Sequence, residues 1–253
     1  MGLPIWALES AELVDLLVDR AALNVPTRVC YVNAHSWNVA RRDRGFHDLL
    51  TSADVLYADG MSLVWASRLL GRPLPARLSS ADYAGDFARA CAERDVSVYL
   101  LGGAGTVAER AADRLIAEAP GLRVAGVADG YFDPTDGADV VDRINRANPD
   151  LLLVGMGSPW QERWSAERRD ALNVPVIWCV GALFDYLADV EPRAPRWMSR
   201  NGLEWVYRLT VDPRGKAERY LLGNPRFVAS LVRTRMRQGI AGRGRRAAGV
   251  DVR

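Results

Sequence analysis

The sequence predicts an α/β fold: a Rossmann-like parallel sheet of about six strands with helices on both faces, plus a basic helical C-terminal appendage. Two observations predict the sheet. Short apolar runs alternate with segments of helical periodicity over most of the 253 residues, and glycine turns follow most of these runs. A third observation predicts the appendage: beyond residue 192, arginine and aromatic side chains interleave without a strand pattern. With 49% apolar residues, the chain can bury a sizeable core.

Each predicted strand is an apolar run that is bounded by turn residues and is too short for a typical helix. The six runs cover residues 28–32, 54–58, 96–101, 122–127, 151–154 and 176–180. Apolar residues recur at helical spacing between these runs, so we predict helices there. These helices cover residues 10–23, 37–50, 81–94, 140–147 and 160–172, and two more end at residues 70 and 119. Beyond the last strand we expect a helix over residues 225–238 and disorder over residues 242–246.

The charge of the chain is divided unequally between two predicted domains, residues 1–192 and residues 193–253. The first carries 18 basic and 27 acidic side chains, and the second carries 15 basic and 4 acidic ones, so their net charges are −9 and +11. A basic appendage on an acidic body predicts an anionic partner: a membrane surface, a nucleic acid or a phosphorylated substrate.

Several classes of protein are not expected. No apolar run is long enough to span a membrane, and the N-terminus does not look like a secretion signal. Cys30, Cys91 and Cys179 form no Cys-x-x-Cys pair, so we expect buried thiols in a reducing cytoplasm. With two histidines and neither an Asp-x-Asp nor a P-loop motif, the sequence predicts no metal site and no cofactor, and argues against a P-loop kinase.

In an open parallel sheet, ligands bind at the carboxyl ends of the strands. The candidate residues at these ends are Asn33, His35, Asp59, Gly102, Gly103, Gly130, Tyr131, Gly155, Gly157, Gln161, Gly181 and Asp185. Glycine turns with a few polar side chains suit the phosphates of a nucleotide. Each glycine alone could equally be present because its turn needs the conformational freedom of glycine.

Residues 155–162 give the strongest local signal, a strand followed by a glycine turn and the start of a helix. Ser158 suits the N-cap and Pro159 the first helical position, so the free N–H groups of this helix could bind phosphate. Ser158 and Gln161 also have the spacing of a capping box. Gln161 could therefore satisfy a backbone N–H rather than contact a ligand.

Two further candidates have a structural alternative as well. Asp59 could act as a general base or as the N-cap of the next helix, and His35 could act as a base, as a hydrogen-bond donor or as a cap. Arg77 stands in a predicted loop, and on this position alone we would expect a solvated arginine with no role in a site. The appendage arginines that could clamp a diphosphate, or else form a solvated face, are Arg193, Arg208, Arg214 and Arg219.

Two other functions stay open on the residues alone. Residues 103–108 fit a dinucleotide-binding fingerprint, with Asp129 about twenty residues further on, which favours an NAD(P)-dependent oxidoreductase. This match lies at the third strand instead of the first. A non-enzymatic adaptor that binds nucleic acid or membrane through the basic tail is the other alternative, and the glycine-lined strand ends argue against it.

Seven motifs together resemble the WecG/TagA/CpsF glycosyltransferase family over about residues 29–222. They are residues 32–35 (VNAH), 58–60 (ADG), 100–103 (LLGG), 130–132 (GYF), 155–162 (GMGSPWQE), 193–197 (RAPRW) and 202–209 (GLEWVYRL). Two positions depart from the family pattern: Tyr31 stands where many relatives have threonine, and Ser80 where relatives often have glycine.

The resemblance implies an inverting, metal-independent transfer of a hexose or N-acetylhexosamine, of the N-acetylmannosamine type or glucose. The donor would be a UDP-sugar and the acceptor a polyprenyl-diphosphate-linked glycan, in exopolysaccharide or cell-wall polymer synthesis. It also implies a cytoplasmic protein bound peripherally to the inner face of the cell membrane, with no nucleic-acid partner, and allows a homo-oligomer.

The resemblance also assigns roles to individual residues. It makes Asp59 the base, Gln161 a substrate-positioning residue and Arg77 a site arginine. Arg208, Arg214 and Arg219 match an appendage that would close over the diphosphate and meet the membrane.

Overall fold

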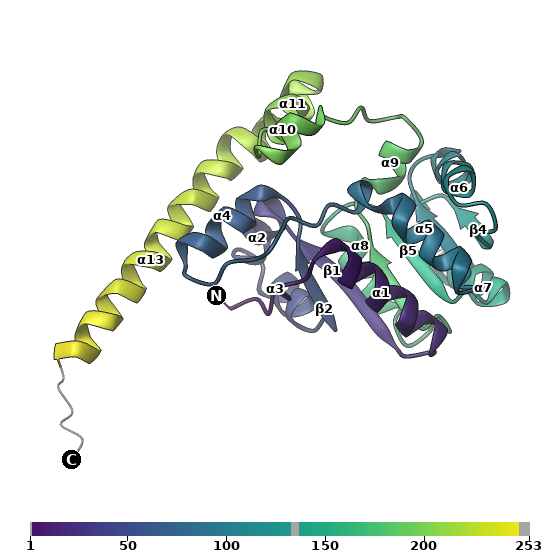
Figure 1. Ribbon diagram of the computed structural model, residues 1–253, viewed down its shortest axis with the longest axis horizontal. Helices are drawn as coiled ribbons and strands as arrows, with labels where there is room; N and C mark the ends of the chain where they lie inside the picture. Colours follow the sequence, from purple (N-terminus) through teal and green to yellow (C-terminus); the bar gives the residue numbers. More distant parts are fainter. Residues whose placement is uncertain (1, 133–136, 248–253) are drawn as a thin grey trace, which may run out of the picture.

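The computed structural model describes residues 2–132 and 137–247, and within them it confirms the α/β prediction (Figure 1). A single all-parallel sheet has the strand order β2-β1-β6-β5-β3-β4. Its strands are β1 (Thr27–Val32), β2 (Val55–Ala58), β3 (Val98–Gly102), β4 (Val124–Ala128), β5 (Leu151–Gly155) and β6 (Val176–Cys179). All six lie within two residues of the predicted positions, and all but the partly buried edge strand β4 consist mainly of buried residues.

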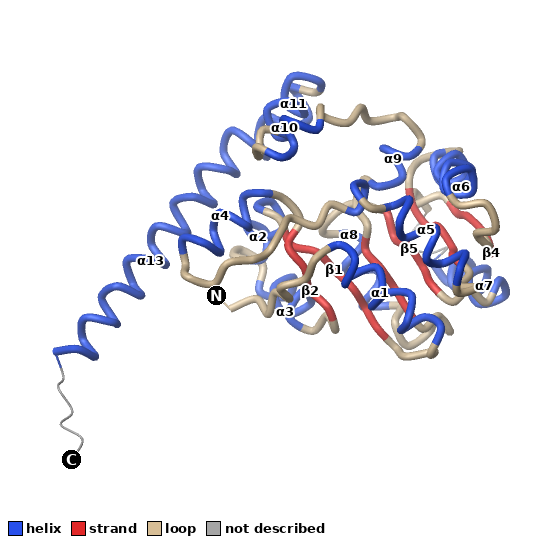
Figure 2. The backbone as a smooth tube through the Cα atoms, in the orientation of Figure 1, coloured by secondary structure: helices blue, strands red, loops and turns tan. Residues whose placement is uncertain are grey.

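Helices cover both faces of this sheet, as the red strands among blue helices in Figure 2 show. They are α1 (Ser10–Ala22), α2 (Ala34–Ala40), α3 (Arg44–Thr51), α4 (Met61–Leu69), α5 (Ala84–Glu93), α6 (Val107–Glu118), α7 (Gly137–Ala147), α8 (Trp160–Glu167) and α9 (Leu183–Leu187). Alternate strand residues face opposite layers. Val29 and Tyr31 of β1 pack in the core with α1, α5, α6 and α9, whereas Cys30 and Val32 pack with α2, α3 and α4.

Three predicted segments differ from the structure. The helix predicted over residues 37–50 is two helices, because Asp43 caps α3 by accepting a hydrogen bond from the Phe46 N–H at 3.0 Å. The helix predicted over residues 160–172 ends at Glu167, where the chain turns back toward β6 and Arg169 donates to the Val174 carbonyl at 2.9 Å. Helix α13 continues to Ala247 and so includes residues 242–246, where disorder was expected.

The appendage is helical. It comprises α10 (Arg196–Arg200), α11 (Glu204–Val211), α12 (Pro213–Ala217), a π-helical turn η3 (Glu218–Leu222) and the long helix α13 (Gly223–Ala247). Helix α13 begins against α2, where the Trp37 and Phe227 rings meet edge to face at 6.1 Å and the Trp37 indole donates to Ser230. Its far end extends away from the sheet (Figure 1). Across residues 2–132 and 137–247, we find no helix both long and apolar enough to cross a bilayer.

Candidate active site

A cavity of about 440 Å³ lies between the carboxyl ends of β1 and β2 and the appendage. Helices α2 and α4 form its walls on the sheet side, while α11, η3 and α13 close it from the other side. Six of the predicted site residues line it: Asn33, His35, Asp59, Arg77, Arg208 and Arg219. Residues more than 100 positions apart in the chain therefore converge on one cavity.

Asn33 and His35 enter this cavity from the turn after β1. Asn33 is the N-cap of α2, because its side-chain oxygen accepts hydrogen bonds from the His35 and Ser36 N–H groups, both at 3.0 Å. The alternative that His35 caps the helix is therefore wrong. Burial, helped by the positive charge of Arg219, lowers the pKa of His35 to about 4. His35 is thus a neutral hydrogen-bonding group near pH 7 and a weak base.

Asp59 follows β2 and is partly buried at the floor of the cavity. Gly60 takes the N-cap position of α4, so the alternative that Asp59 caps this helix is wrong. Burial and, to a smaller extent, the negative charge of Glu204 raise the pKa of Asp59 to about 6. Three arginines oppose this rise, and they are Arg208, Arg77 and Arg219. A carboxylate with this pKa is ionised at neutral pH yet holds a proton well enough to serve as a general base.

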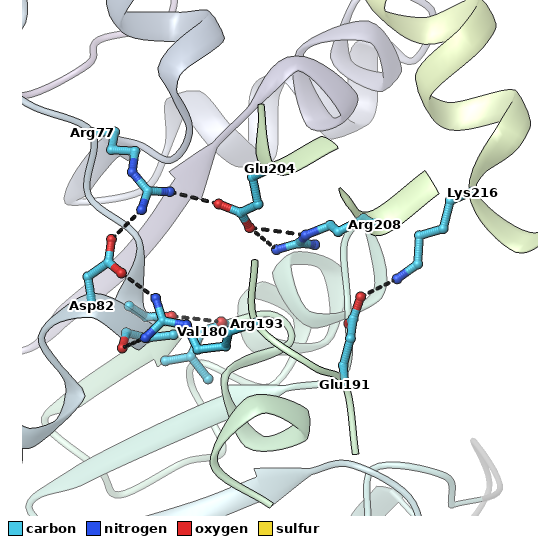
Figure 3. A network of polar contacts seen from close by, with 10 residues as sticks. Arg77, Asp82, Val180, Glu191, Arg193, Glu204, Arg208 and Lys216 are labelled. Atoms are coloured by element: carbon cyan, nitrogen blue, oxygen red, sulfur yellow. Dashed lines mark hydrogen bonds and ion pairs between the residues drawn. The ribbon is translucent and has the colours of Figure 1, made fainter. Parts of the chain in front are cut away.

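Arg77 is not the solvated loop arginine that its sequence position suggested. Its side chain is 12% exposed, and its guanidinium bridges Glu204 at 2.8 Å and Asp82 at 2.6 Å (Figure 3). Arg208 holds the other oxygen of Glu204 through Nη2 at 2.6 Å and Nε at 3.0 Å. Burial disfavours the charge on Glu204, but Arg208 and Arg77 outweigh it, so the net effect lowers the Glu204 pKa. Glu204 therefore stays ionised and holds two guanidinium groups beside Asp59.

The other predicted arginines differ in position. Arg219 lines the cavity from η3, and no carboxylate of the described residues pairs with it. Arg193 pairs with Asp82, donates to the Ala81 carbonyl at 2.7 Å and lies outside the cavity lining (Figure 3). Arg214 is exposed on α12, also outside the lining. A direct contact of Arg193 or Arg214 with a substrate stays a prediction.

The predicted glycines at the ends of β3, β4 and β5 lie outside the cavity lining and pack tightly together. A Cβ on Gly102 would lie 2.3 Å from the Gly155 carbonyl oxygen, and one on Gly130 would lie 2.8 Å from the Cα of Gly102. A Cβ on Gly103 would lie 2.6 Å from the Val107 side chain. A Cβ on Gly157 would have no atom within 4 Å. Most of these glycines thus have a packing role, and their contact with a ligand stays a prediction.

The turn after β5 corrects the predicted capping. Helix α8 begins at Trp160 with Pro159, not Ser158, in the N-cap position, and no side chain caps it. Gln161 is fully buried. Its side-chain oxygen Oε1 accepts a hydrogen bond from the Gly181 N–H at 3.0 Å, and its side-chain Nε2 donates to Glu162 at 2.9 Å. The capping-box alternative for Gln161 is wrong. Gln161 instead ties this turn to the end of β6.

Glu162 is a buried charged residue that the sequence did not indicate. It is fully buried, and its Oε2 has no hydrogen-bond partner among the described residues. Burial raises the pKa of Glu162 to about 7, although the hydrogen bond from Gln161 opposes the rise. Glutamate in the first turn of a helix ordinarily suggests only a favourable interaction with the helix dipole, so no sequence signal separates a buried one from a solvated one.

The remaining predicted residues also lie outside the cavity lining. A Cβ on Gly181 would lie 2.5 Å from the Tyr31 hydroxyl, and Asp185 is partly buried on α9. Tyr131 is 82% exposed. The Asp129 carboxylate accepts the N–H groups of Gly105 at 2.7 Å and Tyr131 at 2.6 Å, so it stabilises the glycine loops. Because both oxygens of the Asp129 carboxylate accept these backbone hydrogen bonds, Asp129 is poorly placed to bind the ribose of a dinucleotide cofactor.

Comparisons with known proteins identify the family of this chain and two of its relatives. The model of the Glycosyl transferase WecG/TagA/CpsF family matches residues 1–241. A protein of Bacillus subtilis (strain 168) is 32% identical over 182 residues, which cover 72% of this chain and 70% of that protein. One from Bacillus spizizenii is 30% identical over 194 residues, covering 77% and 74%. Both are named N-acetylglucosaminyldiphosphoundecaprenol N-acetyl-beta-D-mannosaminyltransferase.

These matches decide between the alternatives that the sequence left open. The family transfers glycosyl groups, so neither the oxidoreductase nor the non-enzymatic adaptor describes this chain. The chain is a glycosyltransferase and belongs to the WecG/TagA/CpsF family.

Proposed function

We propose that this protein transfers an N-acetylmannosamine-type sugar from a UDP-sugar to a polyprenyl-diphosphate-linked N-acetylglucosamine acceptor, as a step in cell-wall polymer or exopolysaccharide synthesis. The names of both Bacillus relatives support the transferred sugar and the acceptor. The family resemblance left N-acetylmannosamine, its uronic acid and glucose open, and these relatives favour the first.

The observation that carries the proposal is the position of Asp59 in the same cavity as Arg77, Arg208 and Arg219. Asp59 accepts the proton of the acceptor hydroxyl as the hydroxyl oxygen bonds to the anomeric carbon of the donor. The bond from that carbon to the UDP oxygen breaks, and UDP leaves with the electron pair. Attack from the face opposite UDP inverts the anomeric configuration.

The arginines supply the second requirement of this reaction, which is stabilisation of the charge that develops on the departing diphosphate. Guanidinium groups match phosphate oxygens in geometry and charge, and they act strongly in a partly buried site. Glu204 already holds Arg77 and Arg208 in place, so little reorganisation is needed when the substrates bind. This arrangement is the basis for proposing a transfer that needs no metal ion.

The surface of the appendage supports a peripheral position at the inner face of the cell membrane. Large apolar side chains that are at least 36% exposed there include Trp197, Trp205, Val211, Leu221, Leu222 and Met236. Exposed arginines of α13, such as Arg226 and Arg233, lie among them in the sequence. Apolar and cationic side chains together are typical of surfaces that bind anionic lipid.

A transfer assay with a panel of donors tests the proposal. We expect UDP-N-acetylmannosamine to be used with undecaprenyl-diphosphate N-acetylglucosamine in the presence of EDTA, and UDP-glucose to be used at least tenfold less efficiently. The product should carry the anomeric configuration opposite to that of the donor, which NMR of the released disaccharide reports. Retention of configuration, or a strict requirement for a divalent cation, would contradict the mechanism.

A further inference from the structure

We propose that the apolar end of the cavity, between α4 and α13, binds the first isoprene units of the acceptor's polyprenyl chain. The proposal rests on the proposed function and locates the lipid part of its acceptor. The cavity has two chemically different ends. One end contains Asp59 and the arginines, and the other is walled by apolar side chains from two helices that are far apart in the sequence.

The apolar end has a buried floor and an exposed rim. Ala66 of α4 and Phe227 and Leu231 of α13 form the floor, and each is less than 9% exposed. The rim carries Leu69 of α4, which is 48% exposed, and Val228 of α13, which is 55% exposed. Neighbouring exposed apolar side chains around a hollow mark a binding surface more often than isolated ones do.

The apolar surface continues outward from the cavity along α13. Val228, Val232 and Met236 follow each other at intervals of four residues, and they are 55%, 42% and 63% exposed. This spacing places them in one row along the helix. Phe227 and Leu231 form a separate row, which is buried against the domain. Helix α13 thus carries a second apolar row that leads away from the cavity.

The chemistry of both ends identifies the occupant. Arg219, which no carboxylate of the described residues pairs with, suits the acceptor's anionic diphosphate at one end, and the apolar walls at the other suit a hydrocarbon chain. A polyprenyl diphosphate joins these two parts in one molecule. A nucleotide would leave the apolar walls uncovered, and a peptide would bring backbone N–H and C=O groups against walls that offer them few partners. We therefore commit to the isoprenoid chain.

The test uses acceptors that differ only in their chain: N-acetylglucosamine diphosphate esters of methanol, citronellol and farnesol, below their micelle-forming concentrations and without membranes. We expect the KM of the full-length protein for the acceptor to fall at least tenfold from the methyl to the farnesyl ester, while the KM for the donor stays constant. Equal KM values for the three esters would overturn the proposal and leave the proposed function intact.

A pair of variants on α13 locates the chain. Val228→Asp places a charge on the rim and should raise the KM for the farnesyl ester at least tenfold. Ala229→Asp places the same charge on the next, exposed position, which does not line the cavity, and should leave the chain-length dependence unchanged. Leu69→Asp repeats the test from the α4 wall. Equal effects of Val228→Asp and Ala229→Asp would refute the location. Thermal unfolding of each variant shows that it is folded.

A binding measurement keeps the inference testable if no transfer is observed. Farnesyl diphosphate should bind the wild-type protein with a negative heat-capacity change, which marks burial of apolar surface, and bind Val228→Asp at least tenfold more weakly. Such binding without any transfer would refute the proposed function and not the inference. Dodecylphosphocholine, which is zwitterionic, is the comparison ligand. If it bound as tightly as farnesyl diphosphate, the apolar end of the cavity would hold bilayer lipid and the proposal would be wrong.

Discussion

The two halves of the sheet's carboxyl edge use their turns in different ways. At the β1/β2 half, Asn33 and Asp59 face a cavity that the appendage closes from above. At the β3/β4/β5 half, Gly102, Gly130 and Gly155 pack so closely that a Cβ on any of them would approach another atom within 2.8 Å. Turns at the carboxyl ends of strands therefore line a ligand cavity in one half and form dense loop packing in the other.

This difference shows what a glycine turn can and cannot reveal. Glycine is required wherever backbone approaches something closely, whether that is a phosphate or another loop. The side chains that face a ligand must in addition be near other charged groups, and among the described residues the appendage brings such groups to the cavity of the β1/β2 half. The following experiments test this contrast.

The largest difference is expected between Asp59 and Asp129, which stand at strand ends in opposite halves of the sheet. Asp59→Asn should lower kcat/KM by roughly 10²- to 10⁴-fold, because the general base is lost, with binding of the UDP-sugar retained. Asp129→Asn, at the other half, should change kcat/KM by less than about threefold and lower stability by about 1–2 kcal/mol, because one hydrogen bond to the loops is lost. Steady-state kinetics and thermal unfolding measure both. If Asp59→Asn kept a near-wild-type rate, Asp59 would not be the base.

The second comparison concerns two glycines of the same half. Gly102→Ala places a methyl group 2.3 Å from a backbone carbonyl and should lower the free energy of unfolding by about 3 kcal/mol or more. Gly157→Ala meets open space and should cost only the strain of its positive φ of 77°, about 1–2 kcal/mol. Urea denaturation reports both values. Gly157→Ala with full stability and impaired donor binding would show that this half also contacts the ligand.

Glu162 should make the free energy of unfolding depend on pH. Its pKa is about 7 in the folded protein, against about 4.5 when unfolded, so the folded state holds a proton that the unfolded state has lost between these values. Stability should therefore fall as pH rises from about 4.5 to about 7. Glu162→Gln should be more stable than wild type at pH 8, by up to about 3 kcal/mol, and no more stable at pH 4. Glu167→Gln, exposed on the same helix, is the control and should show no such difference.

The smallest effect is a shift of the pH profile. Because the pKa of Asp59 is about 6, log(kcat/KM) should rise with pH and level off near that value. Glu204→Gln removes a negative charge that raises this pKa and removes no arginine charge, so the rise should move to lower pH. An unchanged or upward shift of the midpoint would show that Glu204 does not act on Asp59.

Much of the fold could be predicted from the sequence, because all six strands are short apolar runs between turn residues. The break between α2 and α3 could not, since a single cap at Asp43 decides it within one continuous helical pattern. The cavity was predicted only in part. Asp59 and His35 follow from strand ends, but Glu204 acts through Arg77, which lies 127 residues away in the chain. Spacing along the sequence cannot reveal such a contact.

The attachment of the appendage makes the cavity sensitive to ionic strength. No side chain of α11 or α12 is fully buried, and the ion pairs Arg77–Glu204 and Lys216–Glu191 hold this part of the chain to the α/β domain (Figure 3). The side chains of these two pairs are only 12–25% exposed, so a high salt concentration is needed to screen them, and salt leaves apolar packing intact. Concentrated salt should therefore loosen α11 and α12 reversibly and weaken acceptor binding, while the sheet and the base of α13 keep their structure.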